Sequence, residues 1–257
     1  MCQQRIRDHL GSLAPAACTG HGDVGGDIAV FGIGGDLHDE GGQLSFRQST
    51  IGHGGLGSSG QQSACLVQRS LTGVMNYWDE ITTIFDWART HVTSTLYICW
   101  AAQAGLYHFY GVPKYPLKQK MFGIFRHHIN VQGLPIFRGF DDEFFVPHSR
   151  HTEIHREDIL KVKELALIAE SDESGVYMAM ARNGREFFIT GHSEYSPYTL
   201  DTEYKRDLGK GLPIEMPVNY YKDDNPDNAP VVRWRGHANL LFSNWLNYYV
   251  YQKPRLI

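Results

Sequence analysis

The chain has 257 residues, of which 42% are hydrophobic and 20% charged, proportions typical of a globular protein with a sizeable core. Its 28 acidic and 24 basic residues give a formal net charge of -4, which offers no electrostatic basis for binding nucleic acid or a membrane surface. No apolar run reaches the roughly 20 residues that span a bilayer, and residues 1–10 lack the apolar core of a signal peptide. We therefore expect a cytoplasmic protein without a nucleic-acid or membrane partner.

Composition divides the chain near residue 73. Residues 1–73 contain 16 of the 27 glycines but no lysine, tryptophan or tyrosine. So many glycines raise the entropy cost of ordering without supplying side chains to bury, and the segment shows neither helical nor strand periodicity. A dinucleotide-binding GxGxxG pattern starting at Gly32 fails because position 37 is leucine. We expect residues 1–73 to be loosely structured and residues 74–257 to form the folded domain.

The aromatic-rich part of the chain opens with a helix, a strand and a second helix. Residues 79–91 place large apolar side chains at helical spacing, and the β-branched run 92–98 predicts a buried strand. Residues 101–110 are alanine-rich and apolar, and a glycine and a proline follow as a stop signal. Cys99 therefore lies between a predicted strand and a predicted helix.

Short strands and two further helices are expected in the rest of the chain. The predicted strands are residues 121–125, 165–169, 176–181 and 186–190, the last two joined by an Asn183-Gly184 turn. A helix is predicted over residues 197–208, with Ser196 as its N-cap and Gly209 as its stop. Large side chains recur at helical spacing between residues 238 and 251, which predicts an amphipathic helix covering the sheet. This alternation favours a layered α/β domain with parallel strands at its centre.

The position of Cys99 suits a nucleophile. A thiol at the N-terminus of a helix meets the helix dipole and unpaired N–H groups, which stabilise a thiolate. The same N–H groups, including that of Trp100, could receive the oxyanion of a tetrahedral intermediate. The alternative is a buried cysteine that serves as a small apolar side chain, the commoner role of a lone cysteine. Spacing alone leaves both interpretations open.

A second candidate site follows the predicted strand 186–190. His192 and Glu194 are two residues apart, so a turn after Gly191 would let the carboxylate orient the imidazole. A His-x-Glu sequence by itself is also compatible with a solvated loop. The pattern gains weight from Cys99, because a thiol needs a base to take its proton and that base needs a fixed tautomer.

The chain also carries five longer motifs in order between residues 75 and 253. They are Tyr97-Ile98-Cys99-Trp100-Ala101-Ala102-Gln103, Arg138-Gly139-Phe140-Asp141-Asp142, Pro147-His148-Ser149-Arg150, Gly191-His192-Ser193-Glu194-Tyr195 and Asn244-Trp245-Leu246-Asn247-Tyr248-Tyr249-Val250-Tyr251-Gln252. Together they resemble the homoserine O-acyltransferases of methionine biosynthesis. The resemblance implies a three-layer, flavodoxin-like α/β sandwich of the class I glutamine-amidotransferase type.

Catalytic roles follow from the same resemblance. Cys99 would be the acylated nucleophile, His192 the general base and Glu194 the residue that orients it. The reaction would be ping-pong, in which the thiolate first takes the acyl group from acyl-CoA and then passes it to the hydroxyl of homoserine. Backbone N–H groups, with that of Trp100 among them, would hold the oxyanion.

Substrate-binding residues are implied as well. Lys120, Ser149 and Arg206 match family positions that bind substrate, and the two cations have the charge to hold a carboxylate. Without the resemblance, both charges would be interpreted as solvated surface. L-homoserine and an acyl-CoA are then the small-molecule substrates, no resident cofactor is expected, and the relatives suggest a homodimer. We expect no metal: His151 and His155 have the i, i+4 spacing of a helical pair, but the stretch around Pro147 is predicted to be a loop and no third ligand is indicated.

Three functions remain open from the sequence. The first is an acyltransferase that makes O-acyl-homoserine, with acetyl-CoA preferred to succinyl-CoA because residues 97–110 and 191–252 look closer to acetyl-using relatives. The second is a hydrolase or glutaminase with the same Cys-His-Glu set, which is disfavoured because Cys99 lacks the flanking glycines of a GxCxG amidotransferase sequence. The third is an inactive remnant.

The N-terminal part departs from the family pattern. Relatives begin with about one hundred residues that form the first strands of the sheet and a Gly-Ala-Pro loop beside the active site, and residues 1–73 contain neither. We expect this segment to be disordered or translated from a shifted reading frame, with the N-terminal strands missing. Residues 74–257 would then be the C-terminal part of the family's catalytic domain.

Overall fold

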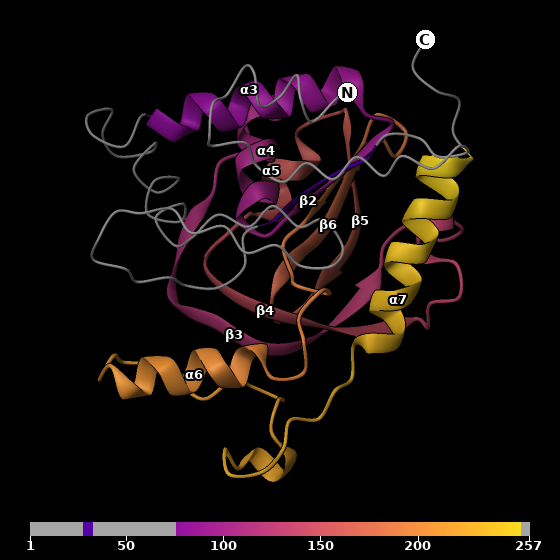
Figure 1. The fold of residues 1–257 in the computed structure, drawn as a ribbon. Helices are drawn as coiled ribbons and strands as arrows, with labels where there is room; N and C mark the ends of the chain where they lie inside the picture. The colour runs from indigo at the N-terminus through magenta and orange to yellow at the C-terminus, as the bar shows by residue number, and fades with distance from the viewer. Residues whose placement is uncertain (1–27, 33–75, 253–257) are drawn as a thin grey trace, which may run out of the picture.

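The computed structural model describes residues 28–32 and 76–252, and within them the fold is built on one seven-stranded sheet (Figure 1). The strands lie in the order β1-β2-β7-β6-β5-β3-β4. Their bounds are Ile28–Gly32 for β1, Ser94–Ile98 for β2, Tyr115–Ile129 for β3, Glu143–Glu153 for β4, Leu165–Ser171 for β5, Gly175–Ala181 for β6 and Glu186–Ile189 for β7. The predicted boundary near residue 73 lies outside the described residues.

The sheet is mixed. β1, β2 and β7 pair in parallel, whereas every other pair of neighbours is antiparallel. The prediction of parallel strands at the centre is therefore wrong, because β6 is central and antiparallel to both neighbours. The expected Asn183-Gly184 turn explains the direction of β6 and β7: both residues have positive φ, 55° and 82°, which suits a tight hairpin. β1 is a strand that the sequence did not predict.

Helices cover both faces of the sheet. One face carries α3 (Asn76–His91), α4 (Trp100–Tyr110) and the short α5 (Arg156–Leu160), and the other carries the 3-10 turn η2 (Pro135–Phe137) and α7 (Arg235–Asn244), which continues as the π-helix η4 (Trp245–Tyr251) (Figure 1). Each face has its own apolar core, centred on Phe85, Tyr97 and Phe188 on the first and on Phe187, Trp245 and Tyr249 on the second. The predicted three-layer α/β arrangement and the C-terminal helix over the sheet are confirmed.

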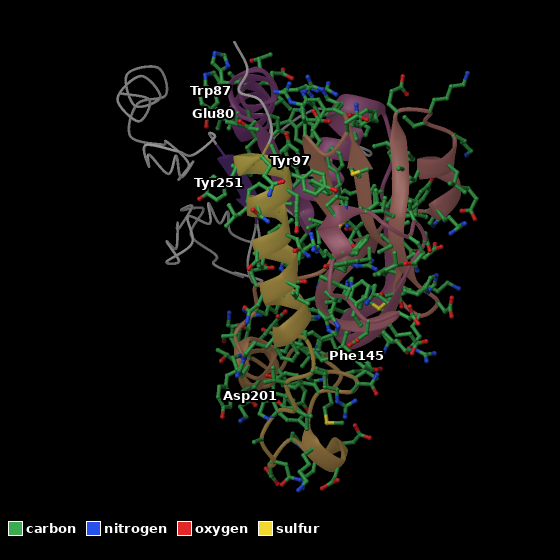
Figure 2. The ribbon with its side chains drawn as sticks, turned by 90° about the vertical axis from the view of Figure 1, so that its right-hand side faces the viewer. Glu80, Trp87, Tyr97, Phe145, Asp201 and Tyr251 are labelled. Atoms are coloured by element: carbon green, nitrogen blue, oxygen red, sulfur yellow. The ribbon has the colours of Figure 1, made fainter. Side chains whose placement is uncertain are left out.

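A third apolar cluster lies at the end of the sheet that is at the bottom of Figure 1, where α6 (Thr199–Gly209) and the 3-10 turn η3 (Lys222–Asp224) are found. Phe122 and Ile124 of β3 meet Leu200 of α6 and Trp234 in this cluster. Figure 2 shows Phe145 and Asp201 at this end of the molecule, and Trp87 at the opposite end. The cluster fixes α6 beside β3 and β4.

Four predictions need correction. The stretch around Pro147 is the buried strand β4 rather than a loop, and its partner β3 is three times as long as the strand predicted over residues 121–125. α6 begins at Thr199 with Tyr198 as its N-cap, while the Ser196 hydroxyl pairs with that of Thr199 at 2.9 Å. The C-terminal helix starts at Arg235, earlier than expected.

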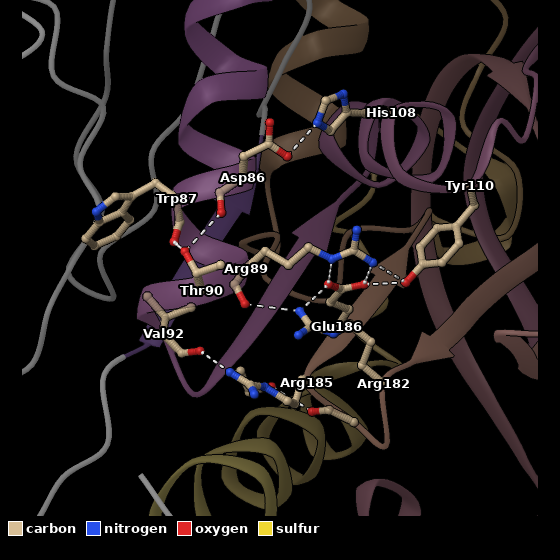
Figure 3. A network of polar contacts seen from close by, with 12 residues as sticks. Asp86, Trp87, Arg89, Thr90, Val92, His108, Tyr110, Arg182, Arg185 and Glu186 are labelled. Carbon is tan, nitrogen blue, oxygen red and sulfur yellow. Dashed lines mark hydrogen bonds and ion pairs between the residues drawn. The ribbon is translucent and has the colours of Figure 1, made fainter. Parts of the chain in front are cut away.

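A buried carboxylate lies at the start of β7, at the opposite end of this strand from the candidate site. Glu186 is 1% exposed and accepts hydrogen bonds from Arg89 at 2.8 Å, Tyr110 at 2.5 Å and Arg182 at 3.1 Å (Figure 3). Two guanidinium groups and a phenol thus compensate the cost of burying the charge. The network ties α3 and α4 to the sheet, and we interpret it as structural.

Candidate active site

The two predicted catalytic segments meet where the neighbouring strands β2 and β7 end. β2 and β7 are parallel, with Ile98 beside Ile189, so the residues that follow both strands emerge at the same edge. The backbone N–H of Cys99 donates to the carbonyl oxygen of Ile189 at 2.6 Å, which extends the pairing by one residue. Cys99 and the Thr190 to Glu194 segment are therefore neighbours although they lie about ninety residues apart in the chain.

Cys99 forms the sharp turn between β2 and α4. It has φ 53° and ψ -111°, a sparsely populated conformation for a residue with a Cβ, and it is the N-cap residue of α4. Its side chain is 97% buried. In an α-helix the N–H groups of the first turn have no acceptor within the helix, so those that begin with Trp100 face the N-terminal end at which Cys99 lies. This strand-turn-helix arrangement is that of a nucleophile elbow.

His192 lies between Cys99 and Glu194. One ring nitrogen, Nδ1, donates to Glu194 Oε1 at 2.6 Å, and the ring shares a side-chain hydrogen bond with Cys99, which leaves Nε2 facing the sulfur. Burial lowers the pKa of His192, but the charges of Cys99 and Glu194 and the hydrogen bonds to both outweigh it and raise the pKa well above the usual value. The imidazole is thus held ready to accept and keep the thiol proton.

The backbone around His192 is held by β4. Its N–H donates to the Pro147 carbonyl at 2.8 Å, and the imidazole stacks on the ring of Tyr195 at 4.1 Å. Gly191 packs so closely against β4 that an added Cβ would lie 2.6 Å from Val146 and 2.9 Å from His148 Nε2. Only a glycine fits this position without displacing a neighbour.

The predicted substrate-binding residues fall into two groups. Lys120 of β3 and Ser149 of β4 both donate to the same carboxylate oxygen of Glu203 on α6, the second at 2.8 Å. Arg206 lies one turn further along α6 and makes a bidentate pair with Asp207, at 2.6 and 2.9 Å. Lys120 and Ser149 are therefore brought together on Glu203, and Arg206 lies one turn further along the same helix.

The sequence analysis missed Glu203 and the supporting role of β4. Glu203 is 4% exposed and stands three residues before Arg206, so both lie on one face of α6. That spacing was a signal that could have been used. His151 lies in β4 and His155 precedes α5, so no helix joins them, and no group of three metal-binding side chains occurs among residues 28–32 and 76–252. No helix of the described part is long and apolar enough to cross a bilayer.

Comparison with known proteins gives a family. Residues 65–256 match the model described as "Homoserine O-succinyltransferase". A homoserine O-acetyltransferase of Phocaeicola vulgatus is 98% identical over 179 residues, which are 70% of this chain and 59% of that protein, and one of Parabacteroides distasonis is 79% identical, covering 70% and 58%. A solved glutamine amidotransferase of Methylobacillus flagellatus has 11% identity and a TM-score of 0.46, covering 68% of this chain and 70% of that one. The chain spans less than two thirds of the length of these two acetyltransferases. Because the family match extends over well over half of its residues, the chain belongs to the homoserine O-succinyltransferase family.

Proposed function

We propose that this chain is a homoserine O-acetyltransferase, which moves an acetyl group from acetyl-CoA to the hydroxyl of L-homoserine in methionine biosynthesis. The observation that carries the proposal is the hydrogen-bonded series Cys99, His192 and Glu194 at the end of two parallel strands. The names of the two acetyltransferase relatives support acetyl as the donor group. A cytoplasmic location and a homodimer remain parts of the proposal.

The first half-reaction loads Cys99. Its thiolate attacks the carbonyl carbon of the acetyl-CoA thioester, and the oxyanion that forms is held by the N–H of Trp100 and its neighbours. The bond between the acetyl carbon and the CoA sulfur then breaks, and the departing CoA thiolate takes a proton from the imidazolium of His192. The enzyme is left as an acetyl thioester with a neutral His192.

The second half-reaction transfers the acetyl group from Cys99 to homoserine. Nε2 of His192 takes the hydroxyl proton of homoserine while the hydroxyl oxygen attacks the thioester carbonyl carbon. Collapse of the second oxyanion breaks the bond to the Cys99 sulfur and restores the thiolate and the imidazolium. Glu194 stays ionised throughout, holding the imidazole tautomer and stabilising its positive charge.

The cluster formed by Lys120, Ser149 and Glu203 suggests where homoserine binds. Lys120, Ser149 and the carboxylate of Glu203 are held together at the α6 end, and Tyr195, which stacks on His192, belongs to the same apolar cluster as Leu200 of α6. An amino acid carries both an ammonium and a carboxylate group, so a site with charges of both signs suits it. When its ion pair with Asp207 breaks, the guanidinium of Arg206 can donate two hydrogen bonds to the carboxylate of homoserine.

Mass spectrometry tests the donor and the nucleophile. The purified full chain is incubated with acetyl-CoA or succinyl-CoA without homoserine, and the peptide that contains Cys99 is weighed. We expect one acetyl group on that peptide, no adduct on the same peptide of Cys99→Ala, and a much slower reaction in His192→Ala. A succinyl adduct instead would change the donor. Absence of both adducts from folded, monodisperse protein would refute the acyltransferase assignment.

Arg206→Lys tests the acceptor site separately. The lysine keeps the positive charge but loses the two-pronged hydrogen bonding that suits a carboxylate. We expect the loading of Cys99 from acetyl-CoA to be unchanged, while the homoserine concentration needed for half-maximal unloading rises about tenfold. Single-turnover measurements with preloaded enzyme give this value directly. Equal homoserine dependence in both proteins would remove Arg206 from the binding site.

A further inference from the structure

A buried cation lies behind the candidate active site and has no carboxylate partner among the described residues. Arg150 of β4 is 1% exposed, and its guanidinium donates to the carbonyl oxygens of Thr152, at 2.7 Å, and of Ser174. Its Nε donates to Nδ1 of His148 at 3.3 Å. Burial lowers the pKa of Arg150 to about 10, so it remains charged at neutral pH. Burying a charge without a carboxylate in direct contact costs free energy, and a functional role would explain why the guanidinium is kept there.

The hydrogen bond from Arg150 sets the protons of two histidines. A guanidinium can only donate, so Nδ1 of His148 is an acceptor and its ring proton is on Nε2. That Nε2 lies 3.1 Å from Nε2 of His127, which therefore accepts, and His127 in turn donates from Nδ1 to the Phe125 carbonyl at 3.0 Å. One direction of hydrogen bonding thus runs from Arg150 through both rings to the backbone of β3. Both imidazoles are neutral in this arrangement.

His148 touches the segment that carries the proposed base. The space above Gly191 is so narrow that an added Cβ would lie 2.9 Å from Nε2 of His148. The next residue, His192, donates its backbone N–H to the carbonyl of Pro147, the residue before His148. The ring of His148 and the carbonyl beside it therefore contact two consecutive residues of the catalytic segment. A change in the orientation of that ring would move the imidazole of His192.

Arg150 also acts on the nucleophile through charge. Among the groups that influence the guanidinium, Cys99 is the first anion, ahead of Glu153, and it favours the charged form of Arg150. The guanidinium therefore lies close enough to Cys99 for the two to interact through charge. Arg150 thus interacts with the segment that carries the base through His148, and with Cys99 through space.

We propose that Arg150 is a positioning residue of the active site, which orients His148 and thereby holds the Gly191–His192 turn where the imidazole reaches the sulfur of Cys99. The proposal rests on the proposed pairing of Cys99 with His192. It does not require any particular acyl donor.

Alkylation of Cys99 by iodoacetamide tests it in the full chain, with the labelled peptide measured by mass spectrometry at about pH 6 and about pH 9. In the wild type, the ion pair with His192 should keep the thiol reactive at the lower pH. Arg150→Met should slow alkylation at the lower pH about tenfold and leave the rate at the higher pH nearly unchanged. The matched control is Arg89→Met, which removes another multiply bonded arginine at the far edge of the sheet (Figure 3). It should lower the melting temperature without changing either rate.

Arg150→Lys separates position from charge. Lysine keeps the cation but lacks the Nε–H donor that contacts His148, so we expect alkylation of Arg150→Lys to stay slow at the lower pH. If Arg150→Lys reacts like the wild type, charge alone is sufficient and positioning through His148 is refuted. Wild-type rates in a folded Arg150→Met protein would overturn the proposal as well. If the wild type is not acylated by either acyl-CoA but the alkylation differences hold, only the proposed function fails.

Discussion

Lowering the pH from about 6.5 to about 4.5 is expected to remove about 2 kcal/mol of the free energy of unfolding through His127, and a further amount through His148. Both rings are fully enclosed, with exposures of 1% and 0%. Burial lowers the pKa of His127 to about 3, and burial together with the charge of Arg150 lowers that of His148 well below the usual value. Even the loss through His127 alone is a large fraction of the whole stability of many domains.

The sign follows from the protons bound in each state. In the unfolded chain both histidines have ordinary pKa values near 6.5, so below that pH the unfolded state binds up to two protons that the folded state does not. Stability therefore falls as the pH decreases, by about 1.4 kcal/mol per pH unit for each histidine, until the folded-state values are reached. Above about pH 8 neither group contributes an appreciable slope.

Urea unfolding at a series of pH values measures this slope, and substitution isolates it. His127→Gln removes one titrating ring, so the decline between about pH 6.5 and 4.5 should become shallower by about 1.4 kcal/mol per unit. His91→Gln, which changes an exposed ring on α3, serves as the control for the substitution itself. Carboxylates that titrate in the same range are common to all three proteins and cancel in the comparison. An identical slope in His127→Gln would contradict the buried, neutral assignment.

The parts of the site that sequence could predict are those with a local signal. The apolar residues before Cys99 and the small residues after it predict a strand-turn-helix unit, and the structure contains it. The run before Gly191 likewise predicts a strand end. Since parallel strands end at the same edge of a sheet, the meeting of these two segments follows once both are strands of one direction. The catalytic roles of Cys99, His192 and Glu194 stay predictions.

The missed parts depend on burial that local patterns do not reveal. β4 contains Pro147, His148, Ser149 and Arg150, residue types that are typical of loops, and yet all four are buried. Their polar groups are satisfied by partners on β3, on α6 and in the turn before β6, which are distant in sequence. The antiparallel centre of the sheet was missed for a related reason, because periodicity identifies strands but not their direction.

Gly191→Ala is expected to slow the loading of Cys99 by about a hundredfold, because it displaces the base rather than removing it. The new methyl group would meet Val146 at 2.6 Å and His148 at 2.9 Å, distances that no Cβ tolerates, so the turn must move away from β4. A displacement of about 1 Å between reacting groups can cost a factor of about 100 in rate. We expect a loss of stability of about 1 to 3 kcal/mol as well, the usual result of overpacking.

The same substitution at Gly236 provides the control. This glycine lies in the first turn of α7, and a Cβ added there would meet nothing within 4 Å. Gly236→Ala should therefore leave the loading rate unchanged and raise stability slightly, by up to about 1 kcal/mol, since alanine favours a helix. Wild-type loading in Gly191→Ala would show that the turn is not held against β4 as described.

A second-site change shows whether the effect comes from the contact with β4. Val146→Ala removes the methyl group that lies nearest to the new side chain, and it should restore part of the loading rate and of the stability in the Gly191→Ala background. In the wild-type background the same change only opens a small cavity and should lower stability. The two substitutions should therefore be non-additive, with a coupling free energy of about 1 kcal/mol or more, as expected for residues in direct contact. Simple additivity would mean that Gly191→Ala acts by some route other than the packing of this turn on β4.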